Sequence, residues 1–508
     1  MQKPAKSEFN RDSGHETHCD RNHAITRKSA IVLCILLAAF LFIEFLLPLR
    51  TTVQIGGDEG FELAKATLWL KGYKPYTDVW NDQPPLHTFL ITQTLRHISP
   101  SILGPRLITV GFAVLLLTAV FLMSLRISGL LVAALVTVLL IASPNFIGLS
   151  SSCMLEIPAL APAMAALSLL LTCRQTKGHL REILAGILFA VSFQTKLIDV
   201  ILLPLAGLIL WLHHRDTASS MSSIIRLLLL LGASLAVSYV AIDCLIENGA
   251  YVRNFQQSWT SHFGGLKSTE YGSPDDYPFD WSVLLKNWDT AIPALLGVLS
   301  CCRQIRKEQM TAFPLALFAL TLLVFTIHRP WWPYYYIHIA IPLCWCAAVG
   351  IEAVYRHISK RGTRSLLVTL CLYTLCALTW MGWRVYLQIK DIRNSAQTYS
   401  SLVLTQIERY KPSTQWMYAD KAIYSFHSGI PLPPPLAVVM LKRMWSGEMT
   451  NARIAEEMRK FKPGVILLAN DTRVVPFKEL MDSEYRLVYE DTDWRFYALK
   501  AVIKGAMK

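Results

Sequence analysis

The stretch AIVLCILLAAFLFIEFLL fills residues 30–47, and GGDEG follows shortly after it at residues 56–60. The first stretch is long and apolar enough to cross the hydrocarbon core of a bilayer, which is about 30 Å thick. The second places two carboxylates, Asp58 and Glu59, between glycines just beyond the end of that span. A plain connector between two helices does not need this chemistry. The sequence therefore predicts a membrane protein whose first outer loop carries reactive groups.

The composition indicates a polytopic α-helical membrane protein. Of the 508 residues, 53% are hydrophobic and only 17% are charged, and the mean hydropathy is +0.37. Soluble domains carry about a quarter charged residues. Apolar stretches of spanning length recur, and we predict about eleven transmembrane helices, with about ten to thirteen compatible with the pattern. The predicted spans are 30–47, 104–124, 129–148, 157–173, 182–194, 197–212, 224–246, 288–302, 311–327, 334–354 and 365–385.

The positions of the cations predict the orientation in the membrane. The net charge is +13, and Lys and Arg cluster in every second short loop. Cytoplasmic loops carry such an excess, so the charge indicates topology and not a nucleic-acid partner. We predict a cytoplasmic tail at 1–28, a transmembrane domain at 29–388 with its first outer loop at 48–103, and a periplasmic or extracellular domain at 389–508. The first span is expected to be a retained signal anchor in a bacterial inner membrane, because no small-residue cleavage site follows it.

The C-terminal segment is predicted to be a small α/β domain. Its strands, helix and hairpin are expected at 415–419, 452–461, 465–468, 485–489 and 494–499. The triplet Asp491-Thr492-Asp493 has the form of a metal-binding DxD motif, but it falls in the hairpin turn, where Asp is ordinary. The 11 cysteines all precede this domain, lie almost entirely in apolar segments and show no zinc spacing, which indicates helix packing.

The first outer loop is predicted to contain a helix that lies along the membrane interface. Phe61 to Lys71 combines an apolar face with a polar flank, and Gly72 ends it. Pro84-Pro85 then begins the next element. Leu86 to Ile98 is either a surface helix or the start of the second span.

The polar residues at the predicted outer rim form the candidate site. Asp58 and Glu59 are the predicted catalytic residues, because a carboxylate can accept a proton from an attacking hydroxyl. The predicted substrate-binding residues are Asp82, Gln83, Glu156, Lys196, His328, Arg329 and Tyr335. All of them fall on one side of the predicted topology, which indicates one shared site.

Several of these residues also have a plain structural explanation. Acids near a helix N-terminus favour the helix dipole, and Asp82 suits a turn. Lys196 could reach the interface by snorkelling, although a cation at a sharp outer turn also suits a phosphate. The aromatic residues around Tyr335 could form an interfacial belt, and Arg329 could take a phosphate bidentately.

Several short motifs between residue 30 and about residue 355 carry a resemblance to a known family. They are Asp58-Glu59-Gly60, Gly72-Tyr73-Lys74-Pro75-Tyr76, Gln83-Pro84-Pro85-Leu86, Arg106-Leu107, Glu156-x-Pro158, Thr195-Lys196 and Tyr335-Tyr336 leading into Pro342. In these motifs the chain resembles the GT-C membrane glycosyltransferases, in the protein mannosyltransferase and aminoarabinose transferase branch.

The resemblance implies inverting transfer of a hexose or pentose from a polyprenyl-phosphate donor to a glycan, lipid or protein acceptor on the outer face. It implies that Asp58 is the base, that Glu156 shapes the site, and that Lys196 meets the phosphate. Some of these enzymes use a divalent cation and others use none, and the sequence offers no convincing ligand set. Aminoarabinose transferases typically carry Glu-Lys before Pro-Pro, whereas this chain has Asp82-Gln83. The departure removes a cation from the motif and argues against assured activity on lipid A.

Two other classes of function stay open from the sequence. A transporter or lipid flippase of envelope biogenesis would place ionisable residues near the bilayer midplane, where the chain offers Glu44 and Asp243. A noncatalytic scaffold in envelope assembly would not depend on Asp58. Because the outer face lacks nucleotide sugars and no phosphate-binding glycine loop is present, a lipid-linked donor fits the outward-facing acids best.

Overall fold

The computed structural model describes residues 26–98, 101–172, 179–216, 220–263, 265–361, 364–398, 401–472 and 475–506. Every predicted apolar span is largely helical within these residues. The helices are α1 (Arg27–Phe45), α4 (Leu103–Ser128), α5 (Leu130–Ile141) with α6 (Phe146–Ser151), α7 (Glu156–Thr172), α8 (Leu180–Phe193), α9 (Leu203–Asp216), α10 (Met221–Glu247), α14 (Trp288–Gln304), α15 (Ala312–Ile327), α16 (Tyr336–Arg361) and α17 (Arg364–Thr398). The predicted tail at 1–28 lies almost wholly outside the described residues.

Within the residues that the structure describes, six helical segments are long and apolar enough to cross a membrane. They are Arg27–Phe45, Leu103–Ser128, Met221–Glu247, Gln309–Ile327, Pro333–Ser359 and Leu367–Ser395. Three shorter apolar segments, Leu130–Ile141, Glu156–Thr172 and Leu197–His213, are also helical. The chain is thus mostly helical with several candidate membrane spans, and the count of eleven spans stays a prediction.

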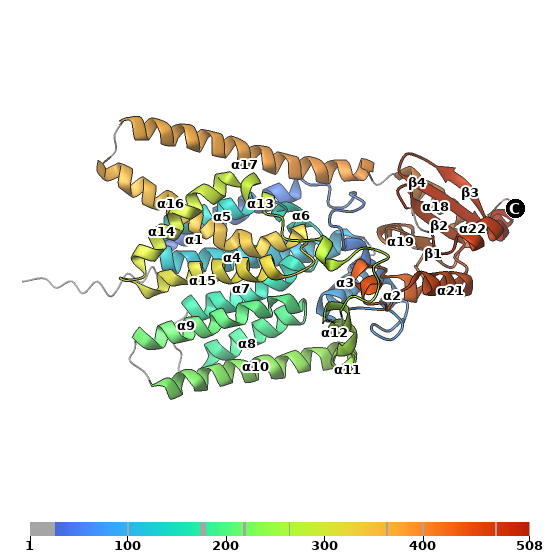
Figure 1. The fold of residues 1–508 in the computed structure, drawn as a ribbon, viewed down its shortest axis with the longest axis horizontal. Helices are drawn as coiled ribbons and strands as arrows, with labels where there is room; N and C mark the ends of the chain where they lie inside the picture. The colour runs from blue at the N-terminus through green and yellow to red at the C-terminus, as the bar shows by residue number, and fades with distance from the viewer. Residues whose placement is uncertain are drawn as a thin grey trace, which may run out of the picture.

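The long helices lie side by side in one bundle, with the C-terminal domain at one end of it (Figure 1). The crossing of α14 and α16 depends on two glycines. A Cβ on Gly297 would lie 1.7 Å from the carbonyl oxygen of Cys346, and a Cβ on Gly350 would lie 2.0 Å from that of Pro293. Small residues of this kind let helix backbones approach closely in membranes.

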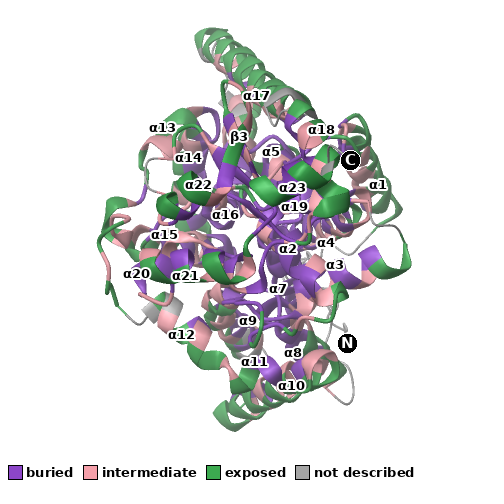
Figure 2. Ribbon diagram, turned by 90° about the vertical axis from the view of Figure 1, so that its right-hand side faces the viewer, coloured by how far each residue is buried: buried purple, intermediate pink, exposed green. Residues whose placement is uncertain are grey.

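The perimeter of the bundle is apolar and exposed, as a lipid-facing surface requires. In the apolar stretch of each helix, only 6% of the residues of α17 and 17% of those of α10 are buried inside the protein. Viewed from the end that carries the C-terminal domain, both helices lie at the edge and are largely coloured as exposed (Figure 2). Their exposed side chains include Val237 and Val240 on α10 and Leu372 and Leu375 on α17.

Residues 48–103, the predicted first outer loop, contain two short helices that lie at the end of the bundle. A helix is present where the sequence predicted one, α2 (Glu59–Leu70), and Gly72, with φ at +92°, follows its end. That this helix lies along the membrane interface stays a prediction. Helix α3 (Leu86–His97) begins directly after Pro85 and is separate from α4, so the open alternative resolves in favour of a short helix of its own. Three further short helices, α11 (Ala250–Arg253), α12 (Phe255–Phe263) and α13 (Ser282–Lys286), come from the loop between α10 and α14.

The C-terminal domain contains a mixed sheet that includes the predicted strands and hairpin. The strand order is β1-β2-β4-β3, with β1 (Met417–Ala419) parallel to β2 (Val465–Ala469) and the hairpin of β3 (Tyr485–Glu490) and β4 (Trp494–Leu499) antiparallel beside β2. Its helices are α18 (Ser401–Tyr410), α19 (Ile423–Ser428), α20 (Leu441–Trp445), α21 (Asn451–Phe461), α22 (Lys478–Glu484) and α23 (Lys500–Ala506). The Asp491 carboxylate accepts the N–H groups of Asp493 and Trp494 at 2.9 and 2.8 Å, which is the turn chemistry expected for this triplet.

The C-terminal domain shares a hydrophobic core with the predicted first outer loop. Leu63 and Ile91 from that loop belong to the same buried cluster as Val403 and Ile423 from the C-terminal domain. The purple ribbon of α2 and α19 meets in the middle of Figure 2. At Gly60 a Cβ would lie 2.6 Å from the backbone nitrogen of Ile423, so only glycine allows α2 and α19 to pack this closely. The domain therefore covers the loop that carries the candidate acids.

Candidate functional site

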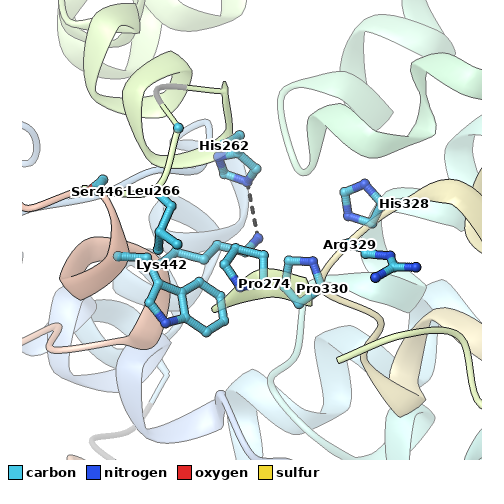
Figure 3. A pocket seen from close by; sticks show the side chains of 10 residues that line it. His262, Leu266, Pro274, His328, Arg329, Pro330, Lys442 and Ser446 are labelled. Atoms are coloured by element: carbon cyan, nitrogen blue, oxygen red, sulfur yellow. Dashed lines mark hydrogen bonds between the residues drawn. The ribbon is translucent and has the colours of Figure 1, made fainter. Parts of the chain in front are cut away.

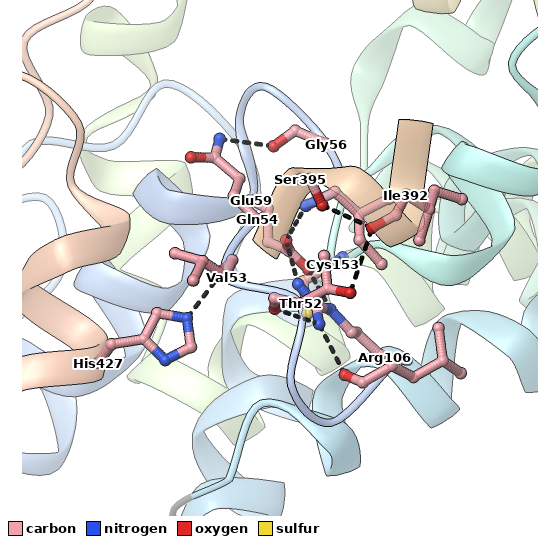
Figure 4. Close-up of polar contacts among 12 residues, drawn as sticks. Thr52, Val53, Gln54, Gly56, Glu59, Arg106, Cys153, Ile392, Ser395 and His427 are labelled. Atoms are coloured by element: carbon pink, nitrogen blue, oxygen red, sulfur yellow. Dashed lines mark hydrogen bonds and ion pairs between the residues drawn. The ribbon is translucent and has the colours of Figure 1, made fainter. Parts of the chain in front are cut away.

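Glu59 is held in a fully buried ion pair with Arg106 of α4 (Figure 4). The two side chains are bidentate, with Nε–Oε1 at 2.9 Å and Nη2–Oε2 at 2.8 Å. The Glu59 carboxylate also accepts the backbone N–H groups of Ile55 and Cys153. Burial raises the pKa of Glu59, but the guanidinium and these donors outweigh that effect and lower it. This carboxylate is therefore ionised and has its oxygens occupied by four donors.

Arg106 also holds the segment that follows α1, at the start of the predicted first outer loop, against the bundle. Its Nη1 donates to the carbonyl oxygens of Leu49 and Thr52 at 2.6 and 2.9 Å. A planar guanidinium with donors on several sides suits this arrangement, which a lysine could not reproduce. The network fixes the backbone on both sides of the neighbouring acid, Asp58.

Asp58 immediately precedes α2 and is only partly exposed. Its side chain makes no hydrogen bond or ion pair with another residue in the part of the chain that the structure describes. Burial raises its pKa to about 6, the charge of Glu156 adds to the rise, and Lys196 opposes it. A carboxylate with a pKa near the working pH and free oxygens can act as a general base.

Glu156 and Lys196 form a second buried ion pair in the same region. Glu156 is the first residue of α7, and Lys196 follows α8. The Nζ–Oε1 distance is 2.5 Å, and the second oxygen of Glu156 is buried and has no partner among the described residues. The ammonium also lies 4.9 Å from the ring centre of Tyr334 and 5.1 Å from that of Tyr335. Burial lowers the pKa of Lys196, but the Glu156 carboxylate outweighs this and raises it, so the lysine stays charged.

Asp82 and Gln83 are buried in the turn before Pro84. The Gln83 amide donates to Asp82 at 2.9 Å, and Nε2 of His262 lies 3.7 Å from the Asp82 carboxylate. The Gln83 carbonyl accepts the hydroxyl of Tyr76 at 2.8 Å. Burial raises the pKa of Asp82, but His262 and Lys442 of α20 outweigh it and lower it. This acid is thus an ionised group with polar partners on several sides.

The turn between α15 and α16 brings His328 to the site and leaves Arg329 at its edge. Burial, Lys442 and Lys196 together lower the pKa of His328 to about 4, so it is neutral at pH 7. Arg329 is more exposed, with 45% of its side chain accessible, and it pairs with Asp275 at 3.3 Å. The structure therefore gathers the predicted residues into one neighbourhood, with Glu59 set behind Asp58 and Arg329 on the rim.

His262 and Lys442 belong to this neighbourhood but were not predicted from the sequence as site residues. His262 comes from α12, and Lys442 comes from α20 of the C-terminal domain, where its Nζ lies 3.2 Å from Nε2 of His262. Each stands in a short helix without a recognisable motif. They are 180 residues apart in the sequence, so only the docking of the C-terminal domain brings them together.

A metal site was left open by the sequence. Among the described residues, no group of three or more His, Cys, Asp and Glu side chains is placed so that it could hold a metal ion.

Comparison with known proteins finds a match in structure and none in sequence. No family model matches the chain, and no curated protein sequence matches it significantly. The crystal structure of ArnT from Cupriavidus metallidurans bound to undecaprenyl phosphate superposes with a TM-score of 0.63 and 15% identity, covering 94% of this chain and 99% of that one. The archaeal oligosaccharyltransferase AglB from Archaeoglobus fulgidus, in complex with an inhibitory peptide and a dolichol-phosphate, gives a TM-score of 0.55 and 12% identity, covering 87% and 69%. The chain thus shares the fold of these two proteins, in agreement with the resemblance that the sequence motifs carry.

Proposed function

We propose that the protein is an inverting glycosyltransferase that moves a sugar from a polyprenyl-phosphate-linked donor to an acceptor at the outer face of a bacterial inner membrane. In this topology the N-terminus is cytoplasmic, and the domain after residue 388 lies outside. The acceptor is a glycan, a lipid or a protein. ArnT is seen with undecaprenyl phosphate and AglB with a dolichol-phosphate, and the shared fold supports the same donor class here.

The observation that carries the proposal is the state of Asp58. Its carboxylate has no side-chain partner among the described residues, its pKa is raised by burial and by Glu156 to about 6, and the charge of Lys196 acts on it. A base in this state is mostly ionised at pH 7 and still basic enough to take a proton.

In the proposed reaction the acceptor hydroxyl attacks the anomeric carbon of the donor. The new bond is between that oxygen and the carbon, the bond from carbon to the phosphate oxygen breaks, and the hydroxyl proton passes to Asp58. Lys196, held by Glu156 and by Tyr335, stabilises the negative charge that builds on the leaving polyprenyl phosphate. Because the nucleophile enters opposite the leaving group, the sugar inverts its configuration.

Glu59 has a different role from the one expected of a catalytic acid. With its oxygens engaged by Arg106 and by two backbone N–H groups, it fixes the loop on which Asp58 stands. We assign it as a positioning residue. Asp82, Gln83, His328 and Arg329 remain proposed substrate-binding residues around this base.

The test uses the purified full-length protein in lipid nanodiscs with a panel of radiolabelled polyprenyl-phosphate hexoses and pentoses. Release or transfer of sugar from one donor by the wild type, and its loss in Asp58→Asn, is the expected result. Turnover in Asp58→Asn close to that of the wild type would refute the assignment of the base. If no donor is consumed but the lipid crosses the bilayer in proteoliposomes, the protein is a transporter or flippase instead.

A further inference from the structure

A small cavity lies between the bundle and the C-terminal domain. Its volume is about 100 Å³, and its lining includes His262 from α12, the turn residues His328 and Arg329, and Lys442 and Trp445 from α20 (Figure 3). None of the described residues that line it carries a carboxylate. The cavity therefore presents cations and nitrogen donors from three separate parts of the chain.

The charge of Lys442 is not neutralised where it stands. Its Nζ donates to Nε2 of His262 at 3.2 Å, and no carboxylate of the described residues lies within ion-pair distance of it. Nδ1 of His262 contacts the carbonyl oxygen of Ser258 at 3.0 Å, so this imidazole accepts from the lysine as a neutral group. Burial and Lys442 lower its pKa to about 4, in agreement with that state.

Two further groups in the lining, His328 and Arg329, are able to bind an anion. Nε2 of His328 is buried without a hydrogen-bond partner among the described residues. Arg329 is held by an exposed pair with Asp275, whose side chain is 79% accessible. Exposed pairs of this kind contribute little stability and exchange readily for another anion.

A charged group that lines the cavity also acts on the proposed catalytic base, Asp58. The positive charge of Lys442 acts on Asp58, on Asp82 and on His328. The charge of Lys196 also lowers the pKa of His262 and of His328. A ligand group in the cavity would thus lie in the same charged neighbourhood as the reacting atoms.

We propose that Lys442, His328 and Arg329 form a phosphate-binding subsite beside Asp58, to which the C-terminal domain supplies the lysine. Lysine binds phosphate as a point charge and arginine binds it bidentately, while an imidazole N–H donates one further hydrogen bond. The phosphate is either that of the polyprenyl donor or one carried by the acceptor, since the chemistry is the same. The assignment rests on the proposed function, and it gives the C-terminal domain a part in substrate binding.

The experiment measures binding to the purified full-length protein in nanodiscs at about 150 mM salt, which is physiological ionic strength. One arm uses radiolabelled undecaprenyl phosphate with undecaprenol as its uncharged counterpart, and the other uses glucosamine 1-phosphate as a soluble phosphate monoester. Lys442→Met removes the charge at similar volume, and Lys442→Arg keeps it. The matched control is Lys478→Met, which removes an exposed lysine of α22 outside the cavity.

Lys442→Met is expected to weaken binding of at least one phosphate probe by about tenfold or more. Lys442→Arg and Lys478→Met should stay within about threefold of wild type, and undecaprenol binding should not change. A loss confined to undecaprenyl phosphate identifies the donor phosphate, and a loss confined to glucosamine 1-phosphate identifies the acceptor. Unchanged binding of both probes by folded, monodisperse Lys442→Met would overturn the subsite. Asp58→Asn should keep phosphate binding, so a failure of sugar transfer is distinguishable from a failure of this proposal.

Discussion

Replacing Asp58 by asparagine should stabilise the protein at neutral pH while it removes activity. The folded-state pKa of about 6 lies above the ordinary value of 3.8, so the fold disfavours the ionised carboxylate. A difference of about two pKa units corresponds to about 3 kcal/mol at about 1.36 kcal/mol per unit. Because the side chain is partly exposed, solvent screening reduces this to about 1–2 kcal/mol.

The sign of the pH dependence follows from linkage. Above about pH 6 Asp58 is ionised in both folded and unfolded protein, so its full cost to stability is present, and asparagine removes it. Below the ordinary pKa of 3.8 the carboxyl is protonated in both states, so the cost disappears. The stability gain of Asp58→Asn should therefore develop between about pH 4 and pH 6 and stay constant above.

The assay is thermal unfolding of the purified protein in nanodiscs at pH 4 and pH 7.5, followed by light scattering and intrinsic fluorescence. We expect Asp58→Asn to unfold about 1–2 °C above wild type at pH 7.5 and at the same temperature as wild type at pH 4. Asp482→Asn, at an exposed aspartate of α22, serves as the control and should have no effect at either pH. An unchanged or lower unfolding temperature at pH 7.5 would show that the ionised Asp58 carboxylate does not destabilise the folded protein.

Three further substitutions probe the scaffold and the phosphate contact. Glu59→Gln breaks the buried ion pair with Arg106 and should lower the free energy of unfolding by about 3–5 kcal/mol, which size exclusion would show as a loss of monodisperse protein. Normal yield and thermal stability would contradict the positioning role. Gly60→Val places atoms against Ile423, where even a Cβ would lie 2.6 Å from the backbone nitrogen. It should lower the free energy of unfolding by about 1–3 kcal/mol and speed proteolysis of the C-terminal domain. Gly57→Ala, at a position where a Cβ meets no other atom within 4 Å, should do neither. Lys196→Met should lower kcat by about 10²–10³-fold with the protein still folded, and a kcat within about threefold of wild type would exclude it from stabilising the leaving group.

Much of the fold could be predicted because the bilayer imposes a simple rule on the sequence. A spanning helix needs a long apolar stretch, and every such stretch proved largely helical. The tail was predictable for a related reason, since β2 and the hairpin of β3 and β4 read as short apolar strands separated by turn residues. The number of spans did not follow with the same certainty, because segments such as α5 and α8 are shorter than a full crossing.

The site could be predicted where its residues stand out in the loops between the apolar stretches, as Glu156 and Lys196 do. Asp58 and Asp82 stood out by their local context, and both lie in the observed neighbourhood. The bidentate contact between Glu59 and Arg106 spans 47 positions, so the sequence could not show that this acid is already occupied. Lys442 enters through the docking of a separate domain, and that packing has no signature in a loop motif.

The central claim is that ionised Asp58 takes the proton from the acceptor, and the pH dependence of donor consumption tests it most directly. Initial rates would be measured from about pH 5 to pH 8 for wild type and Asp58→Asn in nanodiscs, with the sugar donor that the wild type uses. The account predicts that kcat/KM of the wild type falls about tenfold per pH unit below about pH 6. Asp58→Asn should lower kcat/KM at pH 7.5 by about 10²–10⁴-fold, and its kcat/KM should not show this fall below about pH 6. A wild-type profile that stays flat down to pH 5, or an asparagine variant with near wild-type rates, would contradict it.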